Sequence, residues 1–218
     1  IPRGLSKDEA AGFVTPYHTA FHGVLRANLQ GGESMLVLGG AGMTGSAGIQ
    51  IGKALGATII ATARSKDKAD FCSRMGADHV VDPSQEGFVR SLMDLTAGKG
   101  VDVIFDVVGG DVCDRAMGAV ATNGRVSVIG FASGEWLKPN PLDMLYRNFS
   151  VLGVNVQGRL PAERQKAVAD LDAMLAAGQL AVPIDEVFPF EETPQVLDRY
   201  LSQSVDAGRL IIAVDGDN

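Results

Sequence analysis

The stretch Met35-Leu36-Val37-Leu38-Gly39-Gly40-Ala41-Gly42-Met43-Thr44-Gly45 decides the fold class of this chain. An apolar run typical of a buried strand leads into the spacing G-x-G-x-x-G at Gly40, Gly42 and Gly45, and a helix-like segment follows. In such a unit the first glycine permits a tight turn, the second lets the backbone approach a pyrophosphate, and the third lets the helix lie close to the strand. Chance could produce this spacing in a chain with 27 glycines, so the surrounding strand and helix carry the prediction of a dinucleotide site.

The predicted helix itself is rich in glycine, at Gly45, Gly48, Gly52 and Gly56, nearly on one face. Each glycine inside a helix costs roughly 1 kcal/mol relative to alanine. Close packing of that face on a sheet could offset the cost. The alternative is a glycine-rich helix in an α/β protein that binds no nucleotide.

The composition is that of an ordinary globular protein, with 218 residues, 46% hydrophobic and 21% charged. A net charge of -7 argues against nucleic acid or an anionic membrane as the main partner. No apolar stretch is long enough to span a bilayer, and no secretory signal is visible. Two cysteines without a CxxC motif, Cys72 and Cys113, indicate a reduced, cytoplasmic setting. Because the chain begins with Ile1, we expect it to be a piece of a longer protein.

Strand-like and helix-like segments alternate along most of the chain. The expected strands are Met35–Gly39, Thr58–Ala63, His79–Val81, Val101–Val107, Arg125–Gly130 and Ser150–Val154. The expected helices between them are Gly45–Leu55, Lys66–Met75, Gln85–Thr96 and Asp111–Ala119. This alternation predicts an α/β fold: a Rossmann, doubly wound, parallel six-stranded sheet in the order 3-2-1-4-5-6, with helices on both faces.

Two flanking segments lie outside this pattern, so we divide the chain into a helical lead-in (1–30), a nucleotide-binding domain (31–160) and a C-terminal helix/strand tail (161–218). In the tail, Pro161 suits a first helical turn, and Thr193 with Pro194 suits an N-cap and N1 pair. The buried face of the first tail helix is expected at Val168, Leu171, Met174 and Leu175. Two further strands, Val187–Phe190 and Leu210–Val214, should pair outside the six-stranded sheet.

Several motifs together resemble the NADPH:quinone oxidoreductase (zeta-crystallin-like) branch of the zinc-free medium-chain dehydrogenase/reductases, over essentially the whole chain. These are Leu36–Leu55, Ala61–Lys68, Gly76–Val81, Lys99–Val103, Val108–Gly110 and Gly130–Glu135. The resemblance implies a GroES-like catalytic domain ahead of Ile1, on which the tail would pack, so the isolated chain should be incomplete for catalysis. The chain departs from the family pattern at Met43 and Thr44 in the phosphate loop, and at Asp82-Pro83, where a tyrosine is common.

The end of the second expected strand indicates which nucleotide is preferred. NAD-preferring folds place an Asp or Glu there to bind the ribose 2′-hydroxyl, and this chain has Ala61-Thr62-Ala63 instead. Cations follow at Arg64, Lys66 and Lys68, with Ser65 as a hydroxyl donor and helix cap. The resemblance places Ser65 and Lys68 at phosphate-contact positions. We therefore expect NADP(H), although a merely solvated helix start would show the same residues.

The resemblance also implies which residues face the nicotinamide half of the cofactor. Thr19 matches a threonine that touches that side in relatives. Two turns after the fourth and fifth strands complete the set, namely Val108, Gly109, Gly110, Gly130, Phe131 and Ala132. Tight turns after buried strands would show the same glycines without any ligand.

Neither a metal site nor a catalytic side-chain set is predicted. His18 and His22 have a spacing that can bind zinc, but no carboxylate or cysteine lies nearby, so a helix-surface or domain-boundary role is favoured. Hydride transfer needs no side-chain catalyst, because the cofactor carries the chemistry. The leading prediction is transfer of hydride from NADPH to a quinone or another conjugated carbonyl. An enoyl-thioester reductase and a non-catalytic nucleotide-binding module remain alternatives.

The sixth strand suggests how subunits associate. In the expected order it lies at the sheet edge, and residues 150–156 carry none of the lysines or prolines that usually block an edge. Pairing with its own copy across a two-fold axis predicts a homodimer, as in the resembled family. On this prediction, Val154→Pro should separate the subunits.

Overall fold

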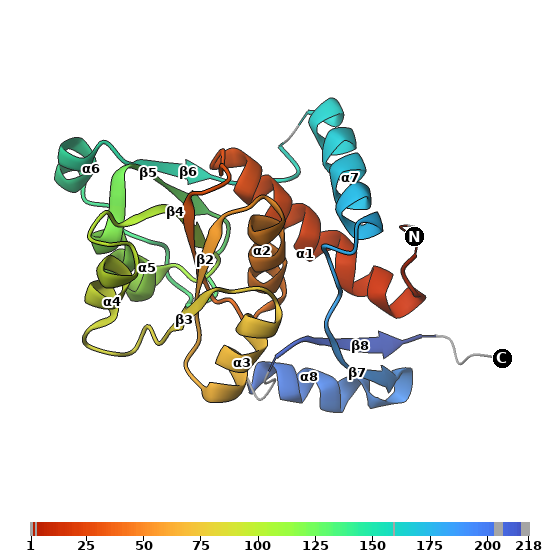
Figure 1. Cartoon of the computed structure of the whole chain (residues 1–218). Coiled ribbons are helices and arrows are strands. Elements are labelled where there is room, and N and C mark those ends of the chain that lie inside the picture. The colour runs from red at the N-terminus through yellow and green to blue at the C-terminus, as the bar shows by residue number, and fades with distance from the viewer. Residues whose placement is uncertain (1, 3, 159, 203–206, 215–218) are drawn as a thin grey trace.

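The computed structural model describes residues 2, 4–158, 160–202 and 207–214, and its centre is a six-stranded parallel sheet (Figure 1). The strands are β1 (Ser34–Leu38), β2 (Thr58–Thr62), β3 (His79–Val81), β4 (Val101–Asp106), β5 (Val120–Val128) and β6 (Ser150–Gly153). Their order is β3-β2-β1-β4-β5-β6, and every neighbouring pair is parallel. The predicted doubly wound Rossmann topology is therefore confirmed.

Helices cover both faces of this sheet. On one face lie α1 (Lys7–Arg26), α2 (Met43–Ala54) and α3 (Lys66–Arg74), and on the other lie α4 (Phe88–Leu95) and α5 (Gly110–Ala116), which a 3-10 turn (Met117–Ala119) extends. Successive residues of a strand point to opposite faces. Accordingly, Met35 and Val37 enter the core under α1 and α2, whereas Leu36 and Leu38 enter the core under α4 and α5.

The glycine face of α2 lies against the sheet, as expected. A Cβ on Gly48 would stand 2.9 Å from the Phe105 ring, and a Cβ on Gly52 would stand 2.4 Å from Met35 Cε. Any larger side chain would push the helix off the sheet. The packing gained by this close approach offsets the helix-propensity cost of the glycines.

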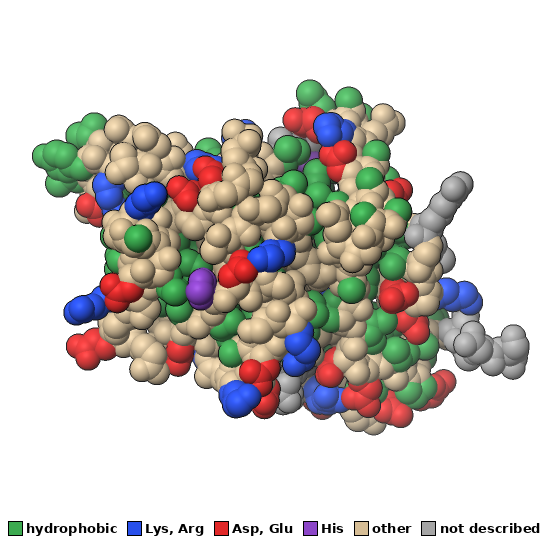
Figure 2. Space-filling view, in the orientation of Figure 1, with side chains coloured by type: hydrophobic (Ala, Val, Ile, Leu, Met, Phe, Trp, Pro, Cys, Tyr) green, Lys and Arg blue, Asp and Glu red, His purple; other side chains and the backbone are tan. Residues whose placement is uncertain are grey.

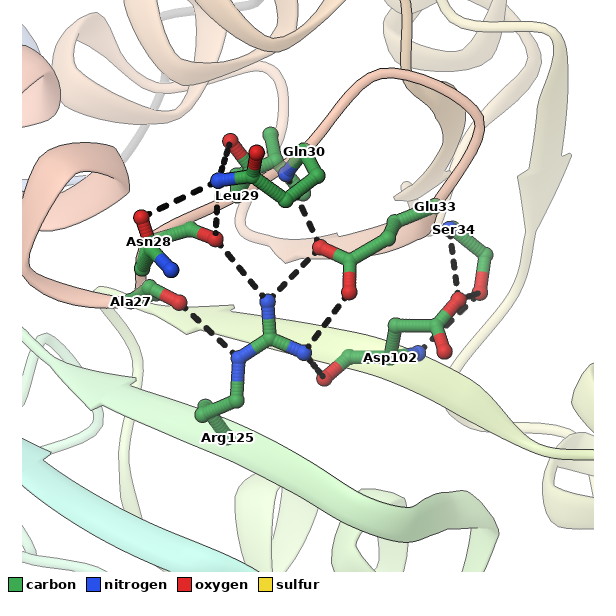
Figure 3. Close-up of polar contacts among 8 residues, drawn as sticks. All are labelled: Ala27, Asn28, Leu29, Gln30, Glu33, Ser34, Asp102 and Arg125. Atoms are coloured by element: carbon green, nitrogen blue, oxygen red, sulfur yellow. Dashed lines mark hydrogen bonds and ion pairs between the residues drawn. The ribbon is translucent and has the colours of Figure 1, made fainter.

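A partly buried ion pair holds the end of the sheet at which its strands begin (Figure 3). Arg125 on β5 donates to both carboxylate oxygens of Glu33, at 3.0 and 2.7 Å, and to the carbonyls of Ala27, Asn28 and Asp102. Five hydrogen bonds thus join the end of α1 to the starts of β1 and β4. A planar guanidinium suits such a fork, which a lysine could not reproduce.

The tail forms a small layer of its own at one end of the molecule (Figure 1). It contains α7 (Pro161–Ala176), β7 (Ile184–Pro189), a 3-10 turn (Phe190–Glu192), α8 (Thr193–Leu201) and β8 (Arg209–Ala213). The two strands pair in parallel with each other and not with the main sheet, so the expectation of separate pairing is confirmed. The predicted lead-in, nucleotide-binding domain and tail each include residues that lie outside the described part, namely 1, 3, 159, 203–206 and 215–218.

Several local expectations about the chain are wrong. Helix α6 (Pro141–Arg147) was not predicted, although Asn140 caps it and Pro141 opens it. Thr193 is not an N-cap, because α8 already includes it and its hydroxyl donates to the Phe190 carbonyl. Val168 is 44% exposed and does not belong to the buried face of α7, where Ala167 takes its place beside Leu171. Among the described residues, no helix is both long and apolar enough to cross a bilayer.

Candidate cofactor site

The glycine loop between β1 and α2 has the predicted order of strand, turn and helix, but the residue that turns the chain is Gly39, one residue before the first glycine of the motif. Gly39 turns the chain at a φ of +72°, and the Gly42 N–H donates to the Gly39 carbonyl at 3.0 Å. A Cβ on Gly45 would stand 2.1 Å from the Gly39 carbonyl oxygen, so no larger residue fits there. At Gly42 the nearest atom would be 3.4 Å away. The fold therefore requires glycine at Gly45, whereas Gly42 leaves open space above the loop.

The first glycine of the motif, Gly40, is buried between neighbouring elements. Its Cβ would stand 3.0 Å from both Ala61 and Cys72. Met43 and Thr44 form the first turn of α2, which begins two residues earlier than predicted. The Met43 side chain is 45% exposed, so it lies beside the loop and does not fill it.

A pocket of about 280 Å³ lies at the carboxyl ends of β2 and β3. It is lined by Ala63, Arg64, Ser65, Lys66, Ala69, Val80, Val81 and Asp82. The predicted Arg64 and Ser65 thus lie together at the end of β2, and no carboxylate of β2 stands there. Ser65 also caps α3, because its Oγ accepts from the Lys68 N–H at 3.3 Å.

The charged side chains around this pocket differ in what else they contact. Lys66 forms an ion pair with Asp70, and this contact raises the pKa of Lys66. Lys68 lies in the first turn of α3 but does not line the pocket. Asp82 accepts hydrogen bonds from the Ser84 hydroxyl and amide and from Gln85, and these bonds lower the pKa of its carboxyl. One carboxylate therefore faces the cations in this pocket.

The loops after β4 and β5 contact each other and the glycine loop. The Ala132 N–H donates to the Val107 carbonyl at 3.1 Å, and the Ser133 N–H donates to the Val108 carbonyl at 2.9 Å. A Cβ on Gly39 would stand 2.9 Å from Val108 Cγ2. The structure thus places the loops after β4 and β5 next to the phosphate loop, at the carboxyl ends of the strands.

Two glycines of this edge adopt conformations that exclude other residues. Gly109 and Gly110 have φ values of +69° and +55°. A Cβ on Gly109 would stand 2.3 Å from the Glu135 carbonyl oxygen. Gly130, Phe131 and Ala132 follow β5 in the facing loop, where the half-exposed Phe131 ring contacts Trp136 at a tilt of 34°, with centroids 4.2 Å apart.

Thr19 lies half-buried on α1, which runs antiparallel to β5. The Ala27 carbonyl accepts from Arg125 at the amino edge, and the Gly23 carbonyl accepts from the Ser127 hydroxyl two residues further along β5. One more turn of α1 toward its start reaches Thr19. This register places Thr19 near the level of the loop that follows β5.

Asp106, the last residue of β4, was missed by the sequence analysis. Its side chain is fully buried, and its Oδ1 accepts from the Val108 and Gly109 N–H groups at 2.9 and 2.8 Å. Burial raises the pKa of this carboxyl, although these hydrogen bonds and the neighbouring Cys113 thiol oppose the effect. A carboxylate at the end of an apolar strand was the available signal.

Arg209 on β8 is a second residue that the sequence analysis missed. Only 1% of it is exposed, its Nε donates to the Gly12 carbonyl, and its Nη2 donates to the Met43 carbonyl at 3.1 Å. The guanidinium also lies over the Tyr17 ring. Its Nη1 has no hydrogen-bond partner within the described part of the chain. The tail therefore delivers a buried positive charge to the phosphate loop.

The two histidines do not form a metal site with other residues of the structure. His22 is fully buried in α1, so the expected surface role is wrong for this residue, and His18 is half-buried. Burial lowers the pKa of His18, and Asp172 opposes this effect. No group of three or more potential metal ligands occurs among the described residues.

Comparison with known proteins gives the family. The family model described as "Zinc-binding dehydrogenase" matches residues 44–173, more than half of the chain. Human quinone oxidoreductase is 26% identical over 97% of this chain, and this chain spans 64% of its length. The chain therefore belongs to the zinc-binding dehydrogenase family, and these findings confirm its resemblance to the quinone oxidoreductase branch.

Solved structures show the same fold. A mycobacterial protein complexed with NADPH superimposes with a TM-score of 0.89 at 22% identity, covering 98% of this chain and 67% of that one. The CurK enoyl reductase superimposes with a TM-score of 0.83 at 26% identity, covering 99% of this chain and 65% of that one. Both exceed this chain in length by about half.

Proposed function

We propose that this chain is the cofactor-binding part of an oxidoreductase that transfers hydride from NADPH to a quinone or another conjugated carbonyl. The observation that carries the proposal is the pocket at the end of β2, where Arg64, Ser65 and Lys66 stand in place of an acidic residue. An Asp or Glu there would bind a ribose 2′-hydroxyl, whereas cations and a hydroxyl suit a 2′-phosphate.

The phosphate loop fits the rest of an anionic dinucleotide. Open space above Gly42 and the N–H groups at the start of α2 suit a pyrophosphate. Arg209 adds positive charge at the same loop, and its Nη1 has no hydrogen-bond partner in the described part of the chain, which leaves that charge incompletely compensated there. Buried charge of this kind favours an anion nearby.

The remaining half of the cofactor would lie over the loops after β4 and β5, since the adenosine half occupies the β2 side. Bound NADPH supplies the hydride. The residues of this chain bind and orient it: Val108, Gly109 and Gly110 would line the ribose, and Gly130, Phe131 and Ala132 would face the nicotinamide with Thr19. No described side chain is proposed as a proton donor.

A second candidate function is reduction of an enoyl thioester. The similarity to the CurK enoyl reductase favours it, because that protein shares the fold at 26% identity. A nucleotide-binding module without catalysis remains the third possibility. All three would use the same cofactor site, but the two enzymes differ in their electron acceptor and the module has none.

An assay of the longest natural form of the protein distinguishes these functions. Quinones and an enoyl-CoA are offered in parallel with NADPH, and loss of NADPH absorbance is followed. Faster oxidation with quinones supports the proposal, and faster oxidation with the enoyl-CoA supports the second candidate. Binding of NADPH without oxidation by either acceptor would contradict both and support the module.

A further inference from the structure

We propose that Asp106 positions the two loops that receive the nicotinamide half of the cofactor, an inference that rests on the proposed function. Asp106 ends β4 at the carboxyl edge of the sheet, between the glycine loop and the loop after β5. It does not need to touch the cofactor. Its role is to fix backbone that would.

Asp106 bonds to both loops at once. Its side-chain Oδ1 accepts from Val108 and Gly109 in the loop after β4. Its backbone carbonyl accepts from Ile129 at 2.9 Å and Gly130 at 3.2 Å in the loop after β5. One residue therefore sets the start of each loop, and the two loops then bond directly to each other.

The side-chain bonds hold a segment whose backbone has unusual freedom. Gly109 and Gly110 both have positive φ, and Gly109 passes so close to the Glu135 carbonyl that a Cβ would stand 2.3 Å from it. Because two consecutive glycines can adopt many backbone conformations, fixed partners are needed to hold this one at the start of α5. Without the carboxyl, the Val108 and Gly109 N–H groups would lose their acceptor, and other backbone conformations would become available.

The geometry also explains why an acid stands in an apolar site. No cation among the described residues forms an ion pair with the Asp106 carboxyl, so a salt bridge does not account for it. The Cys113 thiol of α5 lies beside the carboxyl, and burial together with this neighbouring carboxylate raises the pKa of the thiol. The backbone hydrogen bonds that Asp106 Oδ1 accepts come from Val108 and Gly109 in the loop after β4, and these account for the residue at this position.

Cofactor fragments test the inference. Calorimetry measures the affinity of the unmutated chain, Asp106→Ala and Asp106→Asn for NADPH and for adenosine 2′,5′-bisphosphate, which lacks the nicotinamide half. We expect Asp106→Ala to weaken NADPH about tenfold and to change the bisphosphate by less than about twofold. Asp106→Asn keeps an acceptor oxygen, so it should restore most of the NADPH affinity.

Asp102 offers a matched control on the same strand. Its Oδ2 also accepts two hydrogen bonds, from the Ser34 amide and hydroxyl, but at the amino end of β4, away from the cofactor loops. Asp102→Ala should lower stability without changing the affinity for either ligand. If Asp106→Ala does not fold, Asp106→Ser replaces it with the same expectation, since its hydroxyl is too short to span both amides.

The outcomes separate this inference from the proposed function. Equal weakening of both ligands by Asp106→Ala, or no weakening of either, would overturn the positioning role while leaving the cofactor site intact. If the unmutated chain binds neither ligand, the proposed function fails, and the inference fails with it.

Discussion

At the scale of single residues, the two glycines of the phosphate loop have different tasks. Gly45 has no space for a Cβ, because the Gly39 carbonyl would stand 2.1 Å away, whereas Gly42 has ordinary contact distance. Gly45 is therefore needed for folding, and we propose that Gly42 leaves room for a ligand.

Alanine at each glycine should separate these tasks. Gly45→Ala is expected to lower the free energy of unfolding by about 2 kcal/mol or more, as overpacking does. Gly42→Ala should change stability by less than about 1 kcal/mol while weakening NADPH about tenfold, because its methyl group stands where the pyrophosphate approaches. Chemical denaturation and calorimetry measure both effects. Equal loss of stability in the two variants would contradict this assignment.

Lys68 and Lys66 differ in their surroundings although both belong to the first turn of α3. Lys66 is paired with Asp70, while Lys68 follows the Ser65 cap. Lys68 does not line the pocket at the end of β2, but the family resemblance places it at a phosphate-contact position. On that basis we expect Lys68→Ala to weaken NADPH about tenfold and to leave NADH little changed, since a charge-assisted hydrogen bond contributes roughly 1.5–3 kcal/mol. Lys166→Ala, on the distant helix α7, removes the same charge and is the control. If Lys66→Ala has the larger effect, the phosphate contact is assigned to the wrong lysine.

At the scale of elements, Asp78 joins α2, β2 and β3. Its Oδ2 accepts from the Ile59 N–H at 2.8 Å, and its Oδ1 pairs with Lys53 on α2. Burial alone would raise the pKa of Asp78, but the Ile59 hydrogen bond and the Lys53 ammonium more than offset this, so the pKa lies below its usual value. The ionised carboxylate therefore stabilises the folded state.

This shift predicts a pH dependence. A carboxylate with a lowered folded pKa contributes stability above its unfolded pKa of about 3.9 and loses it as the pH falls further. Asp78→Asn should therefore cost about 1 kcal/mol at pH 7 and almost nothing near pH 2. Asp94→Asn, at an exposed pair 3.8 Å from Arg90, should cost less than about 0.5 kcal/mol at either pH. Denaturant titrations at both pH values test this. A cost for Asp78→Asn that does not change with pH would contradict it.

The elements that were predicted correctly are those that local patterns specify. Apolar runs identified all six strands, although β5 begins at Val120, five residues before the predicted Arg125, and the Ser65 cap identified the start of α3. Helix α6 was missed because Leu142, Leu145 and Tyr146 are exposed and only Met144 is partly buried, so the helix lacks a buried stripe. Asp106 and Arg209 were missed because their roles depend on partners that lie near them only in the fold. In the candidate site, the glycine turns could thus be predicted from the sequence, whereas the buried charged residues Asp106 and Arg209 that contact these loops could not.

At the scale of the whole molecule, β6 remains an uncovered edge. Among the described residues only β5 pairs with it, and α6, which precedes it in the chain, carries exposed Leu142, Leu145 and Tyr146. Figure 2 shows a hydrophobic projection at the position of α6. An open strand next to apolar side chains is a place for self-association. The homodimer through the sixth strand accordingly remains our proposal.

The substitution that tests the dimer must change the outer edge only. Val154 is unsuitable, because its N–H donates to the Val128 carbonyl within the sheet. Val154→Pro would therefore remove a hydrogen bond inside the subunit as well as disturb any contact between subunits. N–H groups alternate in direction along a parallel strand, so that of Gly153 points outward, and a Cβ there meets nothing within 4 Å. Gly153→Pro should give a monomer by light scattering, while Gly153→Ala stays dimeric. A monomeric unmutated chain at micromolar concentration would contradict the proposal.

The central claim is that the chain as a whole forms a site for NADP(H). Calorimetric titration of the unmutated chain with NADPH and, separately, with NADH tests it most directly. Because Arg64 and Ser65 stand at the end of β2 in place of an acid, NADPH should bind at least about tenfold more tightly. Equal affinity for the two cofactors, or no binding of either, would contradict the account.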